Sequence, residues 1–304
     1  MPSISDNGEH VGGTIGFLKS IAWTIRHIRP TRCIIVFDGT GGSTKRKKIY
    51  PEYKNKRINR SSLNRYDEFS DIDSEKDSML KQLNRVSQYL NTLPITTMVI
   101  DMVEADDVIA YLATDVCTDK VTIVSTDKDF LQLVNDRVSV YRPTTKEMYT
   151  PTEIVSEYGV KLDNFLIWRL FEGDASDCIT GVPGIGKKTL IKFFPEISEK
   201  TINYSYLIDE SKNKIATGKK IYKSIIDNAD ILERNYKLMQ LADVDISAEI
   251  KTRIRNIYND SFLMNRTEFK RMWLDDSFQF IIKDVDSWLD STFRELNAIS
   301  NRTT

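Results

Sequence analysis

The sequence of 304 residues has few cysteines and no long apolar run. Its three cysteines, Cys33, Cys117 and Cys178, are odd in number and contain no C-x-x-C pair, which argues against a disulfide framework and against a zinc site. No apolar segment reaches the roughly 20 residues that a membrane span needs, and Met1 to Asp6 lacks the features of a signal peptide. We therefore expect a soluble, cytoplasmic protein that is monomeric and has no membrane association.

The sequence also lacks a net excess of charge of either sign. The formal net charge is −1, and 40% of the residues are hydrophobic, so composition predicts a folded core but says nothing about nucleic acid. The charge is instead unevenly distributed. Residues 41–65 hold a single acid, Glu52, and residues 67–77 are dominated by acids. The basic residues of this segment are Lys45, Arg46, Lys47, Lys48, Lys54, Lys56, Arg57, Arg60 and Arg65.

The basic segment is interrupted by aromatic residues. Tyr50 and Tyr53 among so many cations suit phosphate contact combined with stacking on an unpaired base. The alternative is a solvated charge run, which is the usual fate of such segments. A phosphate substrate would favour nucleic-acid contact, and the acidic residues described next point to one.

Strands and helices alternate along the first half of the chain. Residues 11–29 carry apolar side chains at helical spacing. Residues 32–38 are an apolar run that ends in Asp38, typical of a parallel strand buried on both faces. Further helices are predicted over residues 74–92 and 104–117 and from Asp129 onward, and strands over residues 96–102 and 121–127. The alternation predicts an α/β domain over residues 1–150, and helical patterns predict a helical region over residues 151–304.

Acidic residues gather where the predicted strands end. Ligands in parallel α/β sheets collect at the carboxyl ends of strands. Two divalent cations about 4 Å apart, held by carboxylate oxygens, can activate a water and stabilise the leaving oxygen of a phosphodiester. Any single one of these acids could equally be a helix cap, but three acids in Glu-Ala-Asp-Asp exceed what capping requires. The candidate ligands are Asp38, Glu104, Asp106, Asp107, Asp127, Asp129, Asp174 and Asp177.

A glycine-rich segment follows Asp174 and Asp177. Residues 181–189 are similar to a phosphate loop, G-x-x-x-x-G-K-[ST], but Lys188 stands where Ser or Thr must bind Mg²⁺, and no strand precedes the segment. A helix-hairpin-helix turn fits better, because its glycines let the backbone approach a DNA phosphate at a helix N-terminus. A plain connector between two helices is the alternative.

Taken together, these segments resemble the flap endonuclease and 5′-3′ exonuclease family, which includes the 5′-nuclease domain of bacterial DNA polymerase I and stand-alone phage 5′-nucleases of the RNase H type. The resemblance covers roughly residues 11–240, with the motifs in the same order. It implies a PIN-like parallel sheet flanked by helices, a helical arch over about residues 45–80, and a C-terminal helical region with a helix-hairpin-helix at about residues 173–195. The motifs are Ile35 to Asp38, Arg46 to Arg57, Val103 to Val108, Ser125 to Asp129 and Gly173 to Gly186.

The resemblance also implies roles for individual residues. Two Mg²⁺ or Mn²⁺ ions would be bound, the first by Asp38, Glu104 and Asp106 with Asp107 in support, and the second by Asp127, Asp129, Asp174 and Asp177. Arg46, Lys54 and Arg57 would be the catalytic cations that face the scissile phosphate. DNA, and at the hairpin a K⁺ ion, would be contacted by Tyr53, Gly181, Val182, Gly184, Ile185, Gly186, Lys187, Lys188, Lys219 and Lys220.

The implied activity is hydrolysis of phosphodiester bonds in DNA replication or repair. The substrates would be DNA with a 5′ flap, a nick or an RNA primer, and the products 5′-phosphate and 3′-hydroxyl ends. Replication proteins, such as a polymerase or a single-strand binding protein, would be partners, in the host cytoplasm if the chain is phage-encoded. Two other hypotheses stay open: a junction-binding protein with little catalysis, and a PIN-type ribonuclease.

Two features depart from the family's pattern. Cys178 stands where the family usually has Asn, which would loosen the support of the hairpin. The family's first strand, which ends in a metal-binding Asp, is expected upstream of the helix at residues 11–29 and is not found. From this we expect an upstream extension of roughly 20 to 30 residues to increase both stability and activity.

Overall fold

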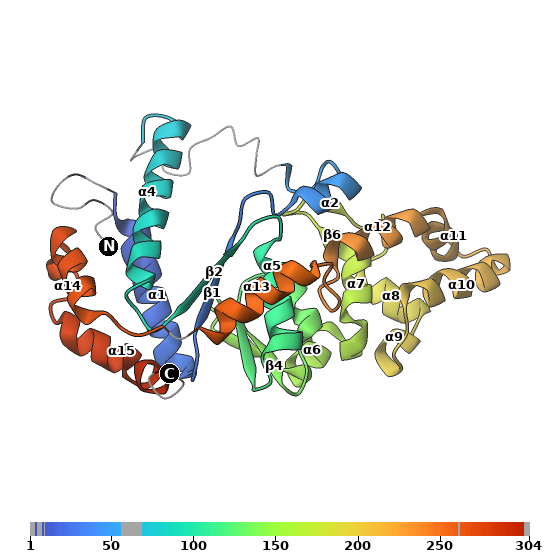
Figure 1. The fold of residues 1–304 in the computed structure, drawn as a ribbon. Coiled ribbons are helices and arrows are strands. Elements are labelled where there is room, and N and C mark those ends of the chain that lie inside the picture. The colour runs from blue at the N-terminus through green and yellow to red at the C-terminus, as the bar shows by residue number, and fades with distance from the viewer. Residues whose placement is uncertain (1–3, 5–7, 9, 56–68, 261, 301–304) are drawn as a thin grey trace. The chain divides into compact units, whose positions relative to one another are not determined.

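The computed structural model describes residues 4, 8, 10–55, 69–260 and 262–300 (Figure 1). By its contacts the chain divides into two compact units, each assembled from separate segments. The first unit consists of residues 1–37, 61–99 and 251–304, and the second of residues 38–60 and 100–250. This division does not test the boundary predicted near residue 150, which stays a prediction. No helix within the described ranges is long and apolar enough to cross a membrane.

The first unit is built on two long helices, α1 (Gly12–Ile28) and α4 (Ile72–Leu90), which pack against each other. The apolar positions that predicted α1 are the ones it buries, among them Ile15, Leu18 and Ile25. Asp71 caps α4 by accepting a hydrogen bond from the Ser74 amide at 2.7 Å. The C-terminal helices α14 (Arg266–Asp275) and α15 (Val285–Ser300) contribute aromatic and aliphatic residues to the same core, so both belong to the packed interior of the first unit.

Strand β1 (Ile34–Asp38) pairs with β2 (Thr96–Ile100). Both strands were predicted, but the expectation that the first would be buried on both faces is wrong: its residues are only partly buried, and Asp38 is exposed. The last residue of each strand, Asp38 and Ile100, belongs to the second unit. Strand β1 therefore presents its terminal carboxylate in the unit that holds the other acidic residues.

The sheet of the second unit has three strands, β3 (Val121–Val124), β4 (Val138–Arg142) and β5 (Glu147–Tyr149). Strand β3 pairs with β4 in parallel, with Val121 opposite Val138, and β4 pairs with β5 in antiparallel. The mixed α/β class is confirmed. In the part of the chain described, the strands form three small sheets rather than one continuous sheet.

The rest of the second unit is mainly helical, as predicted, with one short antiparallel ribbon, β6 (Gly173–Asp174) and β7 (Ile179–Thr180). Helix α7 (Phe165–Glu172) is almost wholly buried and packs on α12 (Ala229–Met239) and α8 (Lys187–Phe193). The remaining helices of the described residues are α2 (Thr44–Ile49), α5 (Ala105–Tyr111) with its π-helical extension (Leu112–Val116), α6 (Pro151–Tyr158), α9 (Glu196–Glu199), α10 (Tyr204–Lys214), α11 (Lys220–Asp227) and α13 (Ala248–Asn259). Short 3-10 turns lie at Lys128–Leu133, Leu162–Asn164, Ile215–Thr217 and Phe278–Phe280.

Candidate metal centre

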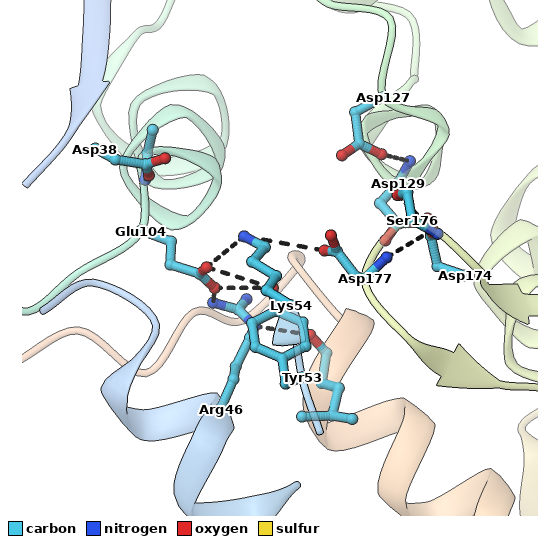
Figure 2. Close-up of polar contacts among 12 residues, drawn as sticks. Asp38, Arg46, Tyr53, Lys54, Glu104, Asp127, Asp129, Asp174, Ser176 and Asp177 are labelled. Carbon is cyan, nitrogen blue, oxygen red and sulfur yellow. Dashed lines mark hydrogen bonds and ion pairs between the residues drawn. The ribbon is translucent and has the colours of Figure 1, made fainter. Parts of the chain in front are cut away.

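Three carboxylates from two loops of the second unit meet at one point. Oxygens of Asp127, Asp129 and Asp174 all lie within 4.8 Å of one another. Asp127 follows β3 and caps the 3-10 turn Lys128–Leu133, accepting a hydrogen bond from the Asp129 amide at 2.8 Å (Figure 2). This short turn brings two carboxylates to the same side. Three hard oxygen donors at this separation have the geometry of a divalent-metal site.

Asp174 is brought to this point by an unusually tight ribbon. Gly173 has a φ of 71°, and a Cβ there would lie 2.5 Å from the Gly181 nitrogen. A Cβ on Gly181, directly after β7, would lie 2.2 Å from the Phe171 carbonyl oxygen, so glycine is needed at both positions where the ribbon meets the end of α7. Asp174 then accepts hydrogen bonds from the amide and hydroxyl of Ser176 at 2.7 and 2.6 Å, which fixes its carboxylate.

A second group of acids binds cations from the basic segment. Glu104 is only 3% exposed, and it accepts hydrogen bonds from Arg46 and from Lys54. The guanidinium of Arg46 also makes two bonds to Asp107, at 2.7 and 2.8 Å. Figure 2 shows the Lys54 ammonium between Glu104 and Asp177. The distance from its nitrogen to a carboxylate oxygen of Asp177 is 3.9 Å. The basic segment is thus anchored on the acidic residues by partly buried ion pairs and is not a solvated charge run at these positions.

The remaining predicted ligands lie as follows. Asp38 is exposed, and one of its oxygens accepts a hydrogen bond from the Ala105 amide at 2.9 Å, which ties the end of β1 to the start of α5. Asp106 is partly buried in the first turn of α5. Among described residues, Asp38, Glu104, Asp106, Asp107 and Asp177 do not join the group of three that lies within 4.8 Å. Arg57, the third predicted catalytic cation, and part of the predicted arch lie outside the described residues.

Tyr53 does not offer its ring to a base. It is 3% exposed, and its hydroxyl donates to Glu104 at 3.1 Å. The stacking role expected for Tyr53 does not fit this geometry, because the ring is enclosed by protein and the polar end is directed at the acidic group. Tyr53 instead adds a third hydrogen-bond donor to Glu104, which holds that carboxylate in one orientation.

Two backbone conformations at the centre are strained. Lys54 has a φ of 56° and Cys178 a φ of 62°, a region that residues with a side chain occupy at a cost of order 1 kcal/mol or more. The two are neighbours, because the Lys54 amide donates to the Asp177 carbonyl at 3.0 Å. Asn tolerates this region better than Cys does, which gives a physical meaning to the departure noted at Cys178.

Arg169 was missed by the sequence analysis. It projects from α7, is 4% exposed, and donates to Asp129 at 2.9 Å and to Asp174 at 3.0 Å. It also donates to the Gly173 carbonyl at 3.1 Å and to Glu172. A single charged residue within the apolar run Phe165 to Phe171 was the available signal, because a buried arginine is rare unless it is paired.

The crowding of carboxylates alters their proton affinity. Burial raises the pKa of Asp106 to about 7, and the charge of Asp127 adds to the rise. Burial likewise raises the pKa of Asp129 to about 7, against the opposing effect of Arg169. At Glu104 burial is outweighed by the charges of Arg46 and Lys54, so its pKa is lowered. Two carboxyls therefore bind protons near neutral pH when no cation replaces them.

The predicted helix-hairpin-helix lies between α7 and α8. The side chains of Val182 and Ile185 are buried, while Gly184, with a φ of 76°, and Gly186 have open space where a Cβ would stand. Lys187 is not directed outward: its ammonium donates to the Glu157 carbonyl at 2.8 Å and lies 5.0 Å from the centre of the Tyr158 ring. Lys188, Lys219 and Lys220 are exposed.

The sequence model of the family described as "5′-3′ exonuclease, N-terminal resolvase-like domain" matches residues 2–159, more than half of the chain. The chain belongs to the 5′-3′ exonuclease family. This confirms the resemblance stated from the motifs, and the fold agrees with it.

Relatives and solved structures extend the likeness beyond residue 159. The 5′-3′ exonuclease of Aquifex aeolicus is 29% identical over 253 residues, which cover 82% of this chain and 78% of the relative. DNA polymerase I of Bacillus subtilis is 27% identical over 292 residues, covering 93% of this chain and 30% of the polymerase. The fold is similar to that of the bacteriophage T5 flap endonuclease solved with DNA and metal ions, with a TM-score of 0.62, 22% identity, and coverage of 87% of this chain and 90% of that one.

The raised pKa of Asp106 should make the stability of the metal-free protein depend on pH. Because its pKa is higher when folded (about 7) than the ordinary 3.8, stability is lost as the pH rises from about 4 through 7. Asp106→Asn removes this loss and should raise the Tm at pH 8 by roughly 2–6 °C, with no comparable gain at pH 5. Thermal unfolding in EDTA measures it. Asp136→Asn, at an exposed site, is the control that should change neither Tm; an equal gain at both pH values for Asp106→Asn would contradict the account.

Proposed function

We propose that the chain is a structure-specific, metal-dependent 5′-nuclease that hydrolyses phosphodiester bonds in DNA carrying a 5′ flap, a nick or an RNA primer. The main support for the proposal is that grouped carboxylates and candidate phosphate-binding cations occur in one compact unit. The carboxylates of Asp127, Asp129 and Asp174 lie at metal-binding separation, and two partly buried cations, Arg46 and Lys54, lie in the same compact unit, the second. Membership of the 5′-3′ exonuclease family and the likeness to a flap endonuclease solved with DNA support it.

The proposed cofactors are two Mg²⁺ or Mn²⁺ ions. Asp127, Asp129 and Asp174, with Asp177 beside them, would hold one; Asp38, Glu104, Asp106 and Asp107 would hold the other. The all-oxygen donor set suits hard cations of this kind. When bound, such ions supply an activated water and stabilise the leaving oxygen.

The chain's own cations would act on the phosphate. Arg46 is held rigidly, since it bonds Asp107, Glu104 and the Leu238 carbonyl, the last at 2.8 Å. Lys54 is positioned by its strained backbone and by the Asp177 carbonyl. A fixed cation facing charge that develops on a phosphate oxygen stabilises the transition state by a few kcal/mol in a site without bulk water. We assign this role to Arg46 and Lys54, together with Arg57.

Duplex DNA would lie along the hairpin. The open space at Gly184 and Gly186 lets a phosphate approach the backbone, and it is here that K⁺ would bind through carbonyl oxygens. Lys188, Lys219 and Lys220 are exposed and would add phosphate contacts, while Lys187 is engaged with the end of α6. A DNA polymerase is the proposed partner, since a relative of this chain is DNA polymerase I.

Cleavage of end-labelled 5′-flap DNA with and without Mg²⁺ tests the proposal, with product lengths read on a gel. Metal-dependent cutting near the base of the flap is the expected result. A preference for single-stranded RNA would favour the PIN-type ribonuclease, and tight flap binding without cutting at any metal concentration would favour the junction-binding protein.

Asp127→Asn should abolish cutting, by roughly 10³-fold or more, and leave flap-DNA affinity within a few-fold. Asn is as good a cap as Asp, so the turn Lys128–Leu133 is kept while a charged ligand is lost. Asp284→Asn is the matched control, because Asp284 also caps a helix, accepting from the Ser287 amide at 2.9 Å, and lies outside the predicted arch and in the first unit. Single-turnover rates and fluorescence anisotropy measure the two properties. A fall in affinity as large as the fall in rate would remove Asp127 from the metal ligands.

Lys188→Ala and Lys187→Ala should separate in their effects. Lys188 is exposed, so Lys188→Ala should weaken duplex binding about 3- to 10-fold. The slope of the logarithm of the binding constant against the logarithm of the salt concentration should fall in magnitude by about one. Lys187 bonds the Glu157 carbonyl, so Lys187→Ala should lower the Tm and leave the affinity for duplex DNA nearly unchanged. Salt-dependent anisotropy and thermal unfolding of both variants measure this. Equal losses of affinity and an unchanged Tm for both would show that Lys187 also faces DNA.

A further inference from the structure

One side chain bonds two of the three grouped carboxylates, Asp129 and Asp174. Asp129 comes from the turn after β3 and Asp174 from the ribbon after α7, forty-five residues apart in the sequence. The guanidinium of Arg169 donates to Asp129 through Nε at 2.9 Å and to Asp174 through Nη2 at 3.0 Å. Its remaining amino group is used by the Gly173 carbonyl, at 3.1 Å, and by Glu172. All three guanidinium nitrogens are therefore engaged at the centre.

We propose that Arg169 is a positioning residue that sets the separation of Asp129 and Asp174 and so determines how tightly the centre binds a divalent ion. The inference rests on the proposed assignment of these two residues as metal ligands. Asp129 accepts from Arg169 through Oδ1, which leaves its second oxygen to face the ion. In Asp174, Oδ2 accepts from Arg169 and Oδ1 from Ser176, so the ion would share an oxygen that also accepts a hydrogen bond. Partners of this kind orient metal ligands, and their loss typically weakens metal affinity 10- to 100-fold.

Electrostatics alone would act in the opposite direction. A positive charge beside a cation site repels the cation, and at 4% exposure the side chain of Arg169 is little screened by water. If Arg169 only neutralised the carboxylates in the absence of metal, removing it would strengthen metal binding. If it fixes their spacing, removing it would weaken binding. The sign of the change therefore separates the two roles.

The arrangement depends on the planar guanidinium group of arginine. Donors at Nε and Nη2 point to two different carboxylates while Nη1 reaches the ribbon backbone. An ammonium is a single point charge and cannot hold these acceptors at fixed angles. Lysine at this position should therefore keep the charge and lose most of the positioning.

The experiment is titration of the full chain with Mn²⁺ alone, without DNA, followed by calorimetry and by electron paramagnetic resonance of free Mn²⁺. Arg169→Gln should weaken one Mn²⁺ site about 10- to 100-fold. Arg169→Lys should fold as the unaltered chain does, but its affinity for Mn²⁺ should stay at least 10-fold lower than that of the unaltered chain. Arg137→Gln is the matched control, because Arg137 bonds the carbonyls of Ala113 and Cys117, both at 2.7 Å, and should leave Mn²⁺ affinity unchanged.

Unchanged or tighter Mn²⁺ binding by Arg169→Gln, or full recovery of affinity by Arg169→Lys, overturns the inference. If Arg169→Gln does not fold, Arg169→Lys decides alone, with a loss of 10-fold or more supporting the proposal and unchanged affinity overturning it. Asp174→Asn separates the inference from the function on which it rests. Loss of the site in Asp174→Asn with none in Arg169→Gln removes only the role of Arg169, whereas unchanged Mn²⁺ binding in Asp174→Asn overturns the ligand assignment as well.

Discussion

Carboxylates that are brought together in a protein repel one another, and in the second unit buried or partly buried cations offset that repulsion. Arg46 bonds Glu104 and Asp107, Lys54 bonds Glu104, and Arg169 bonds Asp129 and Asp174. The offset is incomplete, since burial and neighbouring charge still raise the pKa of Asp106 and Asp129. A centre that stays short of positive charge favours divalent cations, and this is the physical basis of the proposed chemistry.

The same requirement explains features of the backbone that are otherwise unfavourable. The ribbon β6–β7 touches the end of α7 so closely that Gly173 and Gly181 admit no side chain, and this contact sets Asp174 beside Arg169. Lys54 and Cys178 adopt left-handed conformations where the basic segment meets the ribbon. Strain of this kind persists where surrounding contacts impose it, and it is common at functional sites.

The acidic centre was predictable from sequence because it repeats a local rule. A strand followed by Asp was recognisable at Asp38 and Asp127, and the structure places Asp38 at the last position of β1 and Asp127 after β3. Strands β4 and β5 were missed although Val138 and Val140 alternate with polar Ser139, because a five-residue and a three-residue strand give little periodic signal. The burial of Tyr53 and the engagement of Lys187 were beyond local rules, since both depend on partners distant in sequence, Glu104 and Glu157. Arg169 had a signal, a lone charge in an apolar helix, whose meaning depends on which carboxylates the fold brings to it.

Carboxylates from separate loops thus come together as a candidate divalent-metal centre, with the buried Arg169 bonded to two of them. The decisive experiment is a crystal of the full chain soaked in Mn²⁺, with anomalous differences measured at the manganese edge. We expect a manganese peak bound by oxygens of Asp127, Asp129 and Asp174, with Arg169 still donating to Asp129 and Asp174. Manganese bound only elsewhere, or a centre in which Arg169 has left both carboxylates, would show that this arrangement is not the metal site.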